Sequence, residues 1–163
     1  MSKLERIGLG GGCHWCTEAV FQALRGVRRV EPGYIASASP HNGFSEAVIV
    51  HYHPDEISLE VLIGAHLHTH ASRSRHALRE KYRSAIYTFS ESQAAAATSA
   101  LQSLQAEFDA DLVTQVLPFS AFKDADARFH NYYASDPQRP YCQTYIEPKL
   151  RRLRARYGDA IRN

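Results

Sequence analysis

The sequence predicts an α+β fold, the ferredoxin-like split βαβ two-layer sandwich, in which helices cover a sheet. The chain has 163 residues, of which 44% are hydrophobic and 22% charged, and this balance suits a single domain over residues 1–163. Residues 4–89 show strand and helix patterns in the order β-α-β-β-α-β. Periodicity is weak after residue 118, so we expect additional elements and a long irregular C-terminal segment.

The first elements alternate around a glycine turn. A short apolar strand at 4–9 precedes three glycines, and the helix predicted at 15–24 ends before Gly26. Residues 28–36 are compatible with a second strand. Residues 45–53 alternate their side chains with a period of two, which predicts a third strand.

The later elements are marked by serines at helix starts. Ser58 can cap a second helix after a Pro-Asp turn, and Ser90 can cap a third helix that extends to about residue 107. Residues 83–89 and 112–117 are short and mainly apolar, so both are predicted strands.

Charge and hydropathy exclude several functions. The formal net charge is +2, and basic residues gather in KLRRLRAR at 149–156. Leu150 and Leu153 give this segment the apolar stripe of a surface helix, so we expect no nucleic-acid partner. No apolar run approaches the roughly 18 residues of a membrane span, and the N-terminus lacks the apolar core of a signal peptide. We expect a cytoplasmic monomer without a membrane contact.

The cysteines indicate thiol chemistry. There are three, which is too few for a disulfide framework and leaves one unpaired. In the stretch GGGCHWCTEAVF, Cys13 stands at a helix start, where backbone N–H groups and the helix dipole stabilise a thiolate. The glycines leave room for a substrate above its sulfur. Cys16 lies one turn further in, where packing alone explains a small thiol.

Two other interpretations of the C-x-x-C motif stay open at this point. A zinc site would use both cysteines and His14, with further ligands from the histidines at 66–76. This gives an alternative function, a metal-binding or redox-sensing module built on Cys13 and Cys16. A thioredoxin-type dithiol fits the position after a strand, but the tryptophan expected before the first cysteine is absent.

Four blocks in the same order resemble the A-type peptide methionine sulfoxide reductases. GGCHWCTEAVF resembles the family's G-G-C-F-W-x-x-E, and SEAVIVHYHPDEISLEVLI resembles its A-E-A-V-x-V-x-Y-D-P strand. KYRSAIY resembles Q-Y-R-S-A-I-Y, and PYCQTYIEPKLRRLR resembles the P-Y-C tail of many members. The similarity runs from about residue 6 to 157. It implies an oxidoreductase that reduces methionine sulfoxide (the S epimer), free or in proteins, and so repairs oxidative damage.

The resemblance also implies roles for individual residues. Cys13 matches the catalytic cysteine, and Trp15 matches the tryptophan that holds the methyl group of the sulfoxide. Glu46 matches the acid that meets the sulfoxide oxygen, with Tyr34 and Tyr82 as its tyrosine partners. These residue types suit the chemistry, because a thiolate attacks sulfur while the oxygen gains a proton. A carboxylic acid in an apolar pocket keeps that proton.

A second thiol is expected to condense with the sulfenic acid that forms on Cys13. Cys142 matches the family's recycling cysteine, and we favour it because loops move more easily than helices. Cys16 is the alternative, although its sulfur would need local unwinding of the helix to approach Cys13. A thioredoxin-like reductant would clear the disulfide by exchange. No cofactor or metal is implied.

Two departures from the family pattern bear on the substrate. His14 replaces the family's phenylalanine, so a polar imidazole stands where an apolar wall is expected. The family's substrate-binding aspartate falls near Ala77, with His76 or Arg79 as substitutes. We therefore assign His14 and His76 to substrate binding, beside Trp15.

Overall fold

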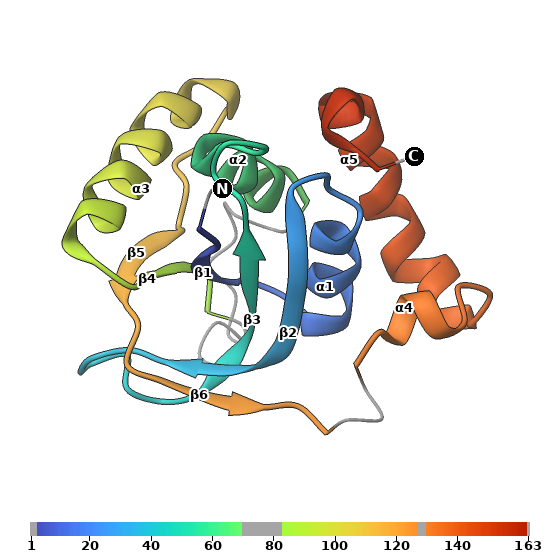
Figure 1. The fold of residues 1–163 in the computed structure, drawn as a ribbon, viewed down its shortest axis with the longest axis horizontal. Coiled ribbons are helices and arrows are strands. Elements are labelled where there is room, and N and C mark those ends of the chain that lie inside the picture. The colour runs from blue at the N-terminus through green and yellow to red at the C-terminus, as the bar shows by residue number, and fades with distance from the viewer. Residues whose placement is uncertain (1–2, 70–82, 127–129, 163) are drawn as a thin grey trace.

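The computed structural model describes residues 3–69, 83–126 and 130–162. The strands are β1 (Glu5–Gly10), β2 (Val27–Ala36), β3 (Ser45–Tyr52), β4 (Ala85–Thr88), β5 (Gln115–Pro118) and β6 (Ala121–Asp124). The α-helices are α1 (His14–Gln22), α2 (Leu59–Thr69), α3 (Glu91–Leu104), α4 (Tyr132–Ser135) and α5 (Glu147–Tyr157), and a π-helical turn, Cys142–Ile146, runs directly into α5. Figure 1 shows these helices arranged around one curled sheet, with α4 and α5 beside α1.

The strands form one mixed sheet in the order β5-β4-β1-β3-β2-β6. All neighbours in this sheet are antiparallel except β4 and β5, which are parallel. The central strand β1 buries Ile7 and Leu9 on one face of the sheet. A Cβ at Gly8 would lie 2.8 Å from side-chain atoms of Ile35 and Tyr87, so glycine lets the other face pack closely.

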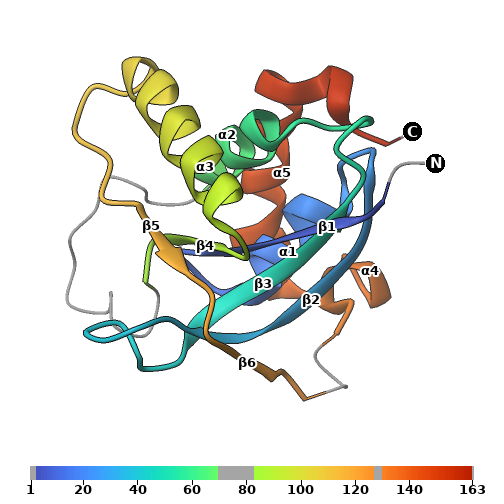
Figure 2. The same ribbon diagram turned by 60° about the vertical axis from the view of Figure 1, so that its left-hand side comes forward.

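The main hydrophobic core lies between the sheet and helices α1, α2, α3 and α5. Figure 2 shows these helices on the same side of the sheet. Leu9, Val50 and Ile86 are fully buried in this core. Helix α5 buries Leu150 and Leu153 while its arginines stay exposed, which confirms the predicted apolar stripe.

A smaller core lies on the opposite face of the sheet, around Ile35, Ile49 and Tyr87. Phe119 and Phe122, from the segment that forms β5 and β6, pack against it. Because β6 pairs with the outer edge of β2, both edges of the sheet are extended by strands from the same segment. The sheet therefore curls around the smaller core.

The predicted order of elements is confirmed in the described part of the chain, with small shifts of their bounds. The last predicted strand lies at Gln115–Pro118 instead of 112–117. The C-terminal segment is more regular than expected, since it contains β6, the short helix α4, the π-helical turn and α5. Among the described helices, none combines the length and apolar character needed to cross a membrane.

Candidate active site

Cys13 lies where β1, the glycine turn and α1 meet. Its backbone is extended, with φ −60° and ψ 130°, and it occupies the N-cap position of α1. Its carbonyl accepts hydrogen bonds from the backbone N–H groups of Cys16 at 3.1 Å and Thr17 at 3.2 Å. The thiol therefore lies at the positive end of the helix dipole. A Cβ at Gly12 would meet no atom within 4 Å, so the space beside Cys13 is open.

Cys16 and Tyr141 hydrogen-bond to the thiol of Cys13. The bond from Cys16 is the largest effect, and together with the bond from Tyr141 it lowers the pKa of the Cys13 thiol to about 6, against the opposing effect of burial. The same bond, together with burial, raises the pKa of Cys16. Burial and the bond to Cys13 also raise the pKa of Tyr141, whose hydroxyl lies 3.9 Å from the Cys16 Sγ. At neutral pH Cys13 is thus a thiolate flanked by two protonated donors.

Glu46 and Tyr34 are directly opposite each other on β3 and β2. Glu46 is buried, and its Oε1 accepts a hydrogen bond from the backbone N–H of His14 at 3.2 Å. The buried His14 ring meets Tyr34 edge-on, with 5.4 Å between ring centroids. Its Nδ1 lies 3.1 Å from the carbonyl oxygen of Gly33 and 3.5 Å from Glu46 Oε1. A negative charge on Glu46 raises the pKa of the Cys13 thiol, so the acid and the nucleophile interact electrostatically.

Trp15, Tyr132 and Tyr141 form an aromatic wall beside Cys13. The Trp15 and Tyr132 rings are stacked, with 4.2 Å between centroids and 8° between planes. Tyr141 meets Trp15 edge-on at 5.4 Å. Because Tyr132 covers one face of the indole, a substrate methyl group can contact only the rest of the ring.

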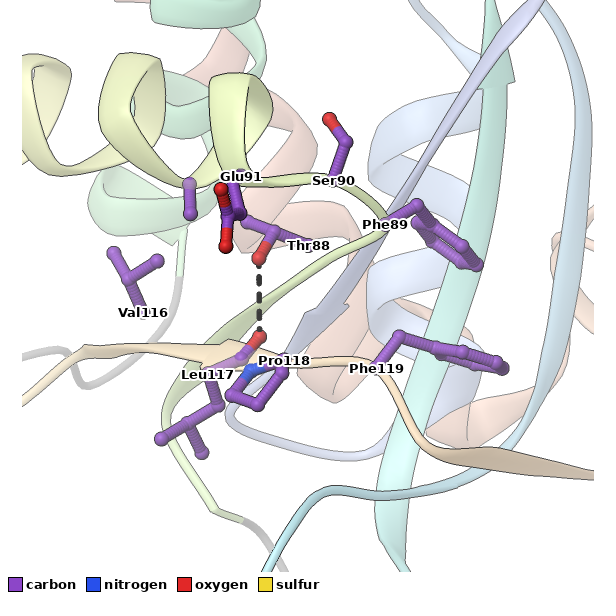
Figure 3. A pocket seen from close by; sticks show the side chains of 9 residues that line it. Thr88, Phe89, Ser90, Glu91, Val116, Leu117, Pro118 and Phe119 are labelled. Carbon is purple, nitrogen blue, oxygen red and sulfur yellow. Dashed lines mark hydrogen bonds between the residues drawn. The ribbon is translucent and has the colours of Figure 1, made fainter.

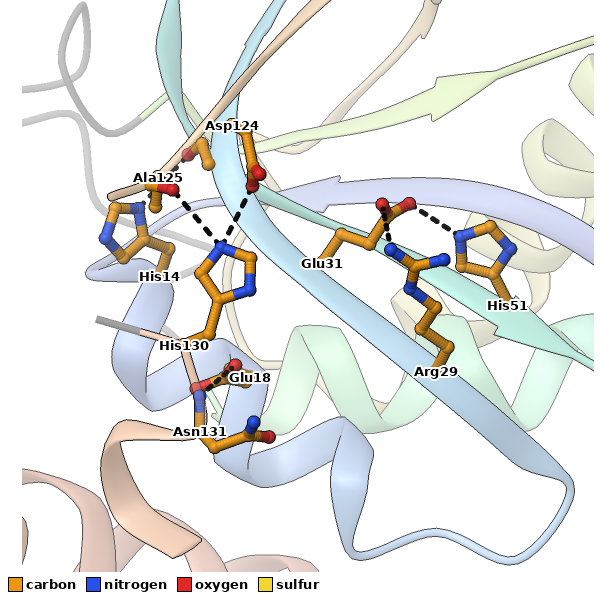
Figure 4. A network of polar contacts seen from close by, with 10 residues as sticks. His14, Glu18, Arg29, Glu31, His51, Asp124, Ala125, His130 and Asn131 are labelled. Atoms are coloured by element: carbon orange, nitrogen blue, oxygen red, sulfur yellow. Dashed lines mark hydrogen bonds and ion pairs between the residues drawn. The ribbon is translucent and has the colours of Figure 1, made fainter. Parts of the chain in front are cut away.

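Glu18, which is 1% exposed, fixes the helix that carries Tyr132. Its carboxylate accepts hydrogen bonds from the backbone N–H groups of Asn131 at 2.9 Å and Tyr132 at 3.2 Å. Figure 4 shows Asn131 beside Glu18 and, nearby, the contact of His130 with Asp124 at 3.0 Å. Burial raises the pKa of Glu18, and the two backbone bonds oppose the rise.

A small cavity of about 10 Å³ lies next to the two N-terminal thiols. It is lined by Gly12, Cys13, Cys16, Thr17, Val20, His66, Thr69 and Lys149. The ammonium of Lys149 donates a hydrogen bond to the carbonyl of Thr69, and His66 Nε2 lies 2.7 Å from the carbonyl oxygen of Gly10.

Cys142 has different surroundings. It is fully buried, and its Sγ donates to the carbonyl of Asp136 at 3.6 Å. Burial raises the pKa of this thiol. Tyr82 and His76 lie outside the described residues, so their expected roles stay predictions.

Over residues 3–69, 83–126 and 130–162, one group of side chains is close enough to hold a metal ion: His53, Asp55 and Glu56. It contains neither thiol of the zinc interpretation, and Glu56 also forms an ion pair with Arg28 at 2.8 Å. A separate hollow of about 370 Å³ lies at the ends of β4 and β5. Figure 3 shows its lining, in which apolar side chains such as Phe119 lie beside Thr88, Ser90 and Glu91, and which contains no thiol.

Four contributors to the site escape sequence reasoning: Glu18, Tyr132, Tyr141 and Lys149. Glu18 is the last residue of the C-x-W-x-x-E block, and Tyr141 and Lys149 belong to the PYCQTYIEPKLRRLR block, so their signal is present only as resemblance. Tyr132 lies in an aromatic-rich segment without periodicity, from which its stacking partner cannot be identified. An activated cysteine, a second thiol in contact with it and a buried acid together define a thiol-dependent redox site.

Comparison with known proteins identifies the family. Residues 5–160 match the family model described as "Peptide methionine sulfoxide reductase". The chain is 37% identical to peptide methionine sulfoxide reductase MsrA of Deinococcus radiodurans over 174 residues, covering 97% of this chain and 84% of that protein. It is 36% identical to the MsrA of Chromobacterium violaceum over 176 residues, covering 98% and 100%. The chain belongs to the peptide methionine sulfoxide reductase family, and it is an oxidoreductase that reduces methionine sulfoxide with thiols.

Solved structures share its fold. Mxr1 from Saccharomyces cerevisiae in reduced form has a TM-score of 0.73 at 23% identity, covering 88% of this chain and 91% of that chain. Methionine sulfoxide reductase A of Corynebacterium diphtheriae has a TM-score of 0.68 at 24% identity, covering 82% and 76%. Mxr1 in complex with Trx2 has a TM-score of 0.64 at 22% identity, covering 78% and 85%.

Proposed function

We propose that this chain reduces methionine sulfoxide, free or in proteins, at the site around Cys13. One observation carries the proposal: the Cys13 thiolate is hydrogen-bonded by Cys16 and Tyr141 and lies next to the buried acid Glu46. A nucleophile and a proton donor are the two groups that reduction of a sulfoxide by a thiol requires.

In the first step the Cys13 thiolate attacks the sulfoxide sulfur while Glu46 donates a proton to its oxygen. The sulfur–oxygen bond of the substrate breaks, and the oxygen and proton remain on Cys13 as a sulfenic acid. The thioether is released, reduced by the two electrons that Cys13 has lost. We infer that Tyr34, and Tyr82 by resemblance, orient the sulfoxide oxygen, while Trp15, His14 and His76 bind the rest of the substrate.

In the second step we propose that Cys16, rather than Cys142, resolves the sulfenic acid. The support is the contact between the two thiols, which hydrogen-bond to each other and line one cavity. Because Cys13 is the N-cap and Cys16 lies in the first turn of α1, pairing of the two thiols involves only the start of this helix. Cys142 is fully buried, and its Sγ donates a hydrogen bond to the carbonyl of Asp136 and not to either thiol of α1. Cys142 is therefore the second candidate for the resolving cysteine.

A thioredoxin-like dithiol would then reduce the disulfide by exchange, and the structure of yeast Mxr1 with Trx2 supports a reductant of this kind. Specificity for the S epimer follows from family membership. The order β4-β1-β3-β2 of the central strands supports the ferredoxin-like description of the fold. We retain a cytoplasmic monomer as the proposed state.

The test combines turnover with the identity of the disulfide. The reduced protein is mixed with one equivalent of a methyl sulfoxide without reductant, and the products are identified by mass spectrometry. We expect one equivalent of thioether and a Cys13–Cys16 disulfide in the wild type and in the Cys142→Ser variant. No thioether above the level of a Cys13→Ser control would overturn the proposed reaction. A Cys13–Cys142 disulfide in the wild type would overturn the assignment of Cys16.

A further inference from the structure

Helix α5 places a lysine in the cavity next to the two thiols. Lys149 lies in the first turn of α5, directly after the π-helical turn. Its ammonium donates to the carbonyl of Thr69, the last residue of α2, so the negative end of that helix dipole stabilises the positive charge. Cys13 and Cys16 line the same cavity, which is no larger than about one water molecule.

We propose that Lys149 is the counter-ion that stabilises the Cys16 thiolate in the resolving step. This role rests on the proposed function, because it applies only after Cys13 has been oxidised. Cys16 is 4% exposed, and a buried thiolate is costly unless a positive charge compensates it. The shared cavity places such a charge next to Cys16.

Oxidation of Cys13 removes some of the effects that raise the pKa of Cys16. In the reduced protein, the hydrogen bond to the Cys13 thiolate, burial and the repulsion by that thiolate all raise the pKa of Cys16. A sulfenic acid on Cys13 is neutral, so the repulsion disappears and the bond to an anion is lost. Burial then remains as the main opposing effect, and the charge of Lys149 lowers the pKa of Cys16 against it.

The charged and titratable groups around Lys149 come from three helices. Cys13 and Cys16 at the start of α1 favour its charged form, and Arg152 on α5 opposes it. On α2, His66 lines the cavity with its Nε2 close to the Gly10 carbonyl oxygen. Burial is the largest effect on Lys149 and lowers its pKa. The thiols of Cys13 and Cys16 therefore share one nearby positive charge, the ammonium of Lys149.

The resolving step balances without a further reactant. The Cys16 thiolate attacks Sγ of Cys13, the sulfur–sulfur bond forms, and the sulfur–oxygen bond of the sulfenic acid breaks. The leaving hydroxide takes up a proton equivalent to the one that Cys16 has lost, and water is released. Lys149 carries its charge throughout and does not bond to either sulfur, so it acts as a positioning residue.

The test separates the two chemical steps in the variant Lys149→Met. Reduced protein is mixed with excess N-acetylmethionine sulfoxide without reductant, and samples are quenched over time with dimedone, which traps sulfenic acid. Arg152→Met is the matched control, because it removes an exposed positive charge from the same helix. At a pH well above the Cys13 pKa of about 6, where this thiol stays ionised, we expect unchanged thioether formation in both variants. In Lys149→Met alone, disulfide formation should slow about tenfold, because a rise of about one unit in the pKa of Cys16 reduces its thiolate fraction tenfold. The sulfenic acid on Cys13 then persists and is trapped as a dimedone adduct.

A pH series distinguishes electrostatics from structure. In Lys149→Met the lost rate of disulfide formation should return when the pH is raised by about one unit, because the thiolate fraction grows tenfold per unit below the pKa. Equal disulfide rates in both variants would overturn the proposal, as would equal slowing of both chemical steps with an unshifted pH profile. Absence of thioether from the wild type would instead overturn the proposed function.

Discussion

The backbone N–H of His14 donates a hydrogen bond of 3.2 Å to Oε1 of Glu46. This bond ties the acid on β3 to the first residue of α1, which directly follows Cys13. The relative position of acid and nucleophile is therefore set by the backbone of the helix start. The side chain at position 14 can change without breaking this link, since the donor belongs to the main chain.

The substitution Glu46→Gln should abolish most of the activity. The amide oxygen of the glutamine can still accept from the N–H of His14, but the side chain has no acidic proton to donate. We expect kcat to fall by roughly 10²–10⁴-fold, the range for loss of a general acid. Steady-state kinetics measure this, and an unchanged melting temperature shows that the fold is intact. A kcat within about threefold of the wild type would show that another group donates the proton.

The reactivity of Cys13 should depend on pH with a midpoint near its lowered pKa of about 6. The thiolate fraction grows as the pH rises through the pKa, so alkylation by iodoacetamide should be slow below this midpoint and constant above it. Cys16→Ala removes the largest stabilising bond and should raise the midpoint toward the ordinary thiol value of about 8.5. Tyr141→Phe should raise it less, and Cys142→Ala should leave it unchanged.

Burial of Glu18 should make the wild type less stable as the pH rises. Its pKa is raised in the folded state, so the folded protein binds more protons than the unfolded chain between about 4.3, the unfolded value, and the raised pKa. The free energy of unfolding therefore decreases with pH across this window. The Glu18→Gln variant lacks this pH-dependent contribution of the carboxyl group. Its amide NH₂ also faces one of the two backbone N–H groups that Glu18 accepts from, and this loss costs about 1–3 kcal/mol of the free energy of unfolding.

Urea denaturation of the wild type and the Glu18→Gln variant across this pH range measures the difference. We expect the stability advantage of the wild type to narrow as the pH increases. The exposed Glu91→Gln variant is the control, and it should show no such trend. An advantage of the wild type that grows with pH would contradict a raised pKa at Glu18.

The substitution His14→Phe, which restores the family residue, should tighten substrate binding. An apolar ring beside Tyr34 offers the substrate methyl group a dry contact, and about 1 kcal/mol of added apolar contact corresponds to roughly a fivefold lower KM. The value of kcat should change little, because the link from the backbone to Glu46 is kept. The carbonyl of Gly33 loses its contact with the imidazole, so stability should fall by about 1 kcal/mol. A higher KM would instead identify His14 as a polar contact of the substrate.

The order of the elements up to β4 could be predicted because each has its own local signal. The alternation at residues 45–53 specifies β3, and the glycines around Cys13 specify the turn before α1. Strand β6 has four residues and no clear alternation, so its pairing with β2 depends on tertiary contact. The C-terminal helix is predictable only as an apolar stripe, from Leu150 and Leu153.

The candidate site was predictable where residues lie on paired strands or at the helix start. Tyr34 and Glu46 are brought together by the register of β2 and β3, and both flank the start of α1. Tyr132 and Tyr141 come from a segment without periodicity, and the helical pattern around Lys149 does not indicate its partners, so nothing local shows which part of α1 or α2 these residues contact. The choice between Cys16 and Cys142 likewise depends on packing that the spacing of cysteines does not encode.

The stack of Trp15 on Tyr132 joins two residues that are far apart along the chain, as does the contact of Cys16 with Tyr141. Because such contacts close long loops, we expect them to form late in folding, after local elements have paired. During synthesis the thiols of α1 leave the ribosome long before the segment that covers and activates them. Before that segment docks, the Cys13 thiol therefore lacks the hydrogen bond from Tyr141, and its reactivity is completed when the C-terminal segment packs against α1.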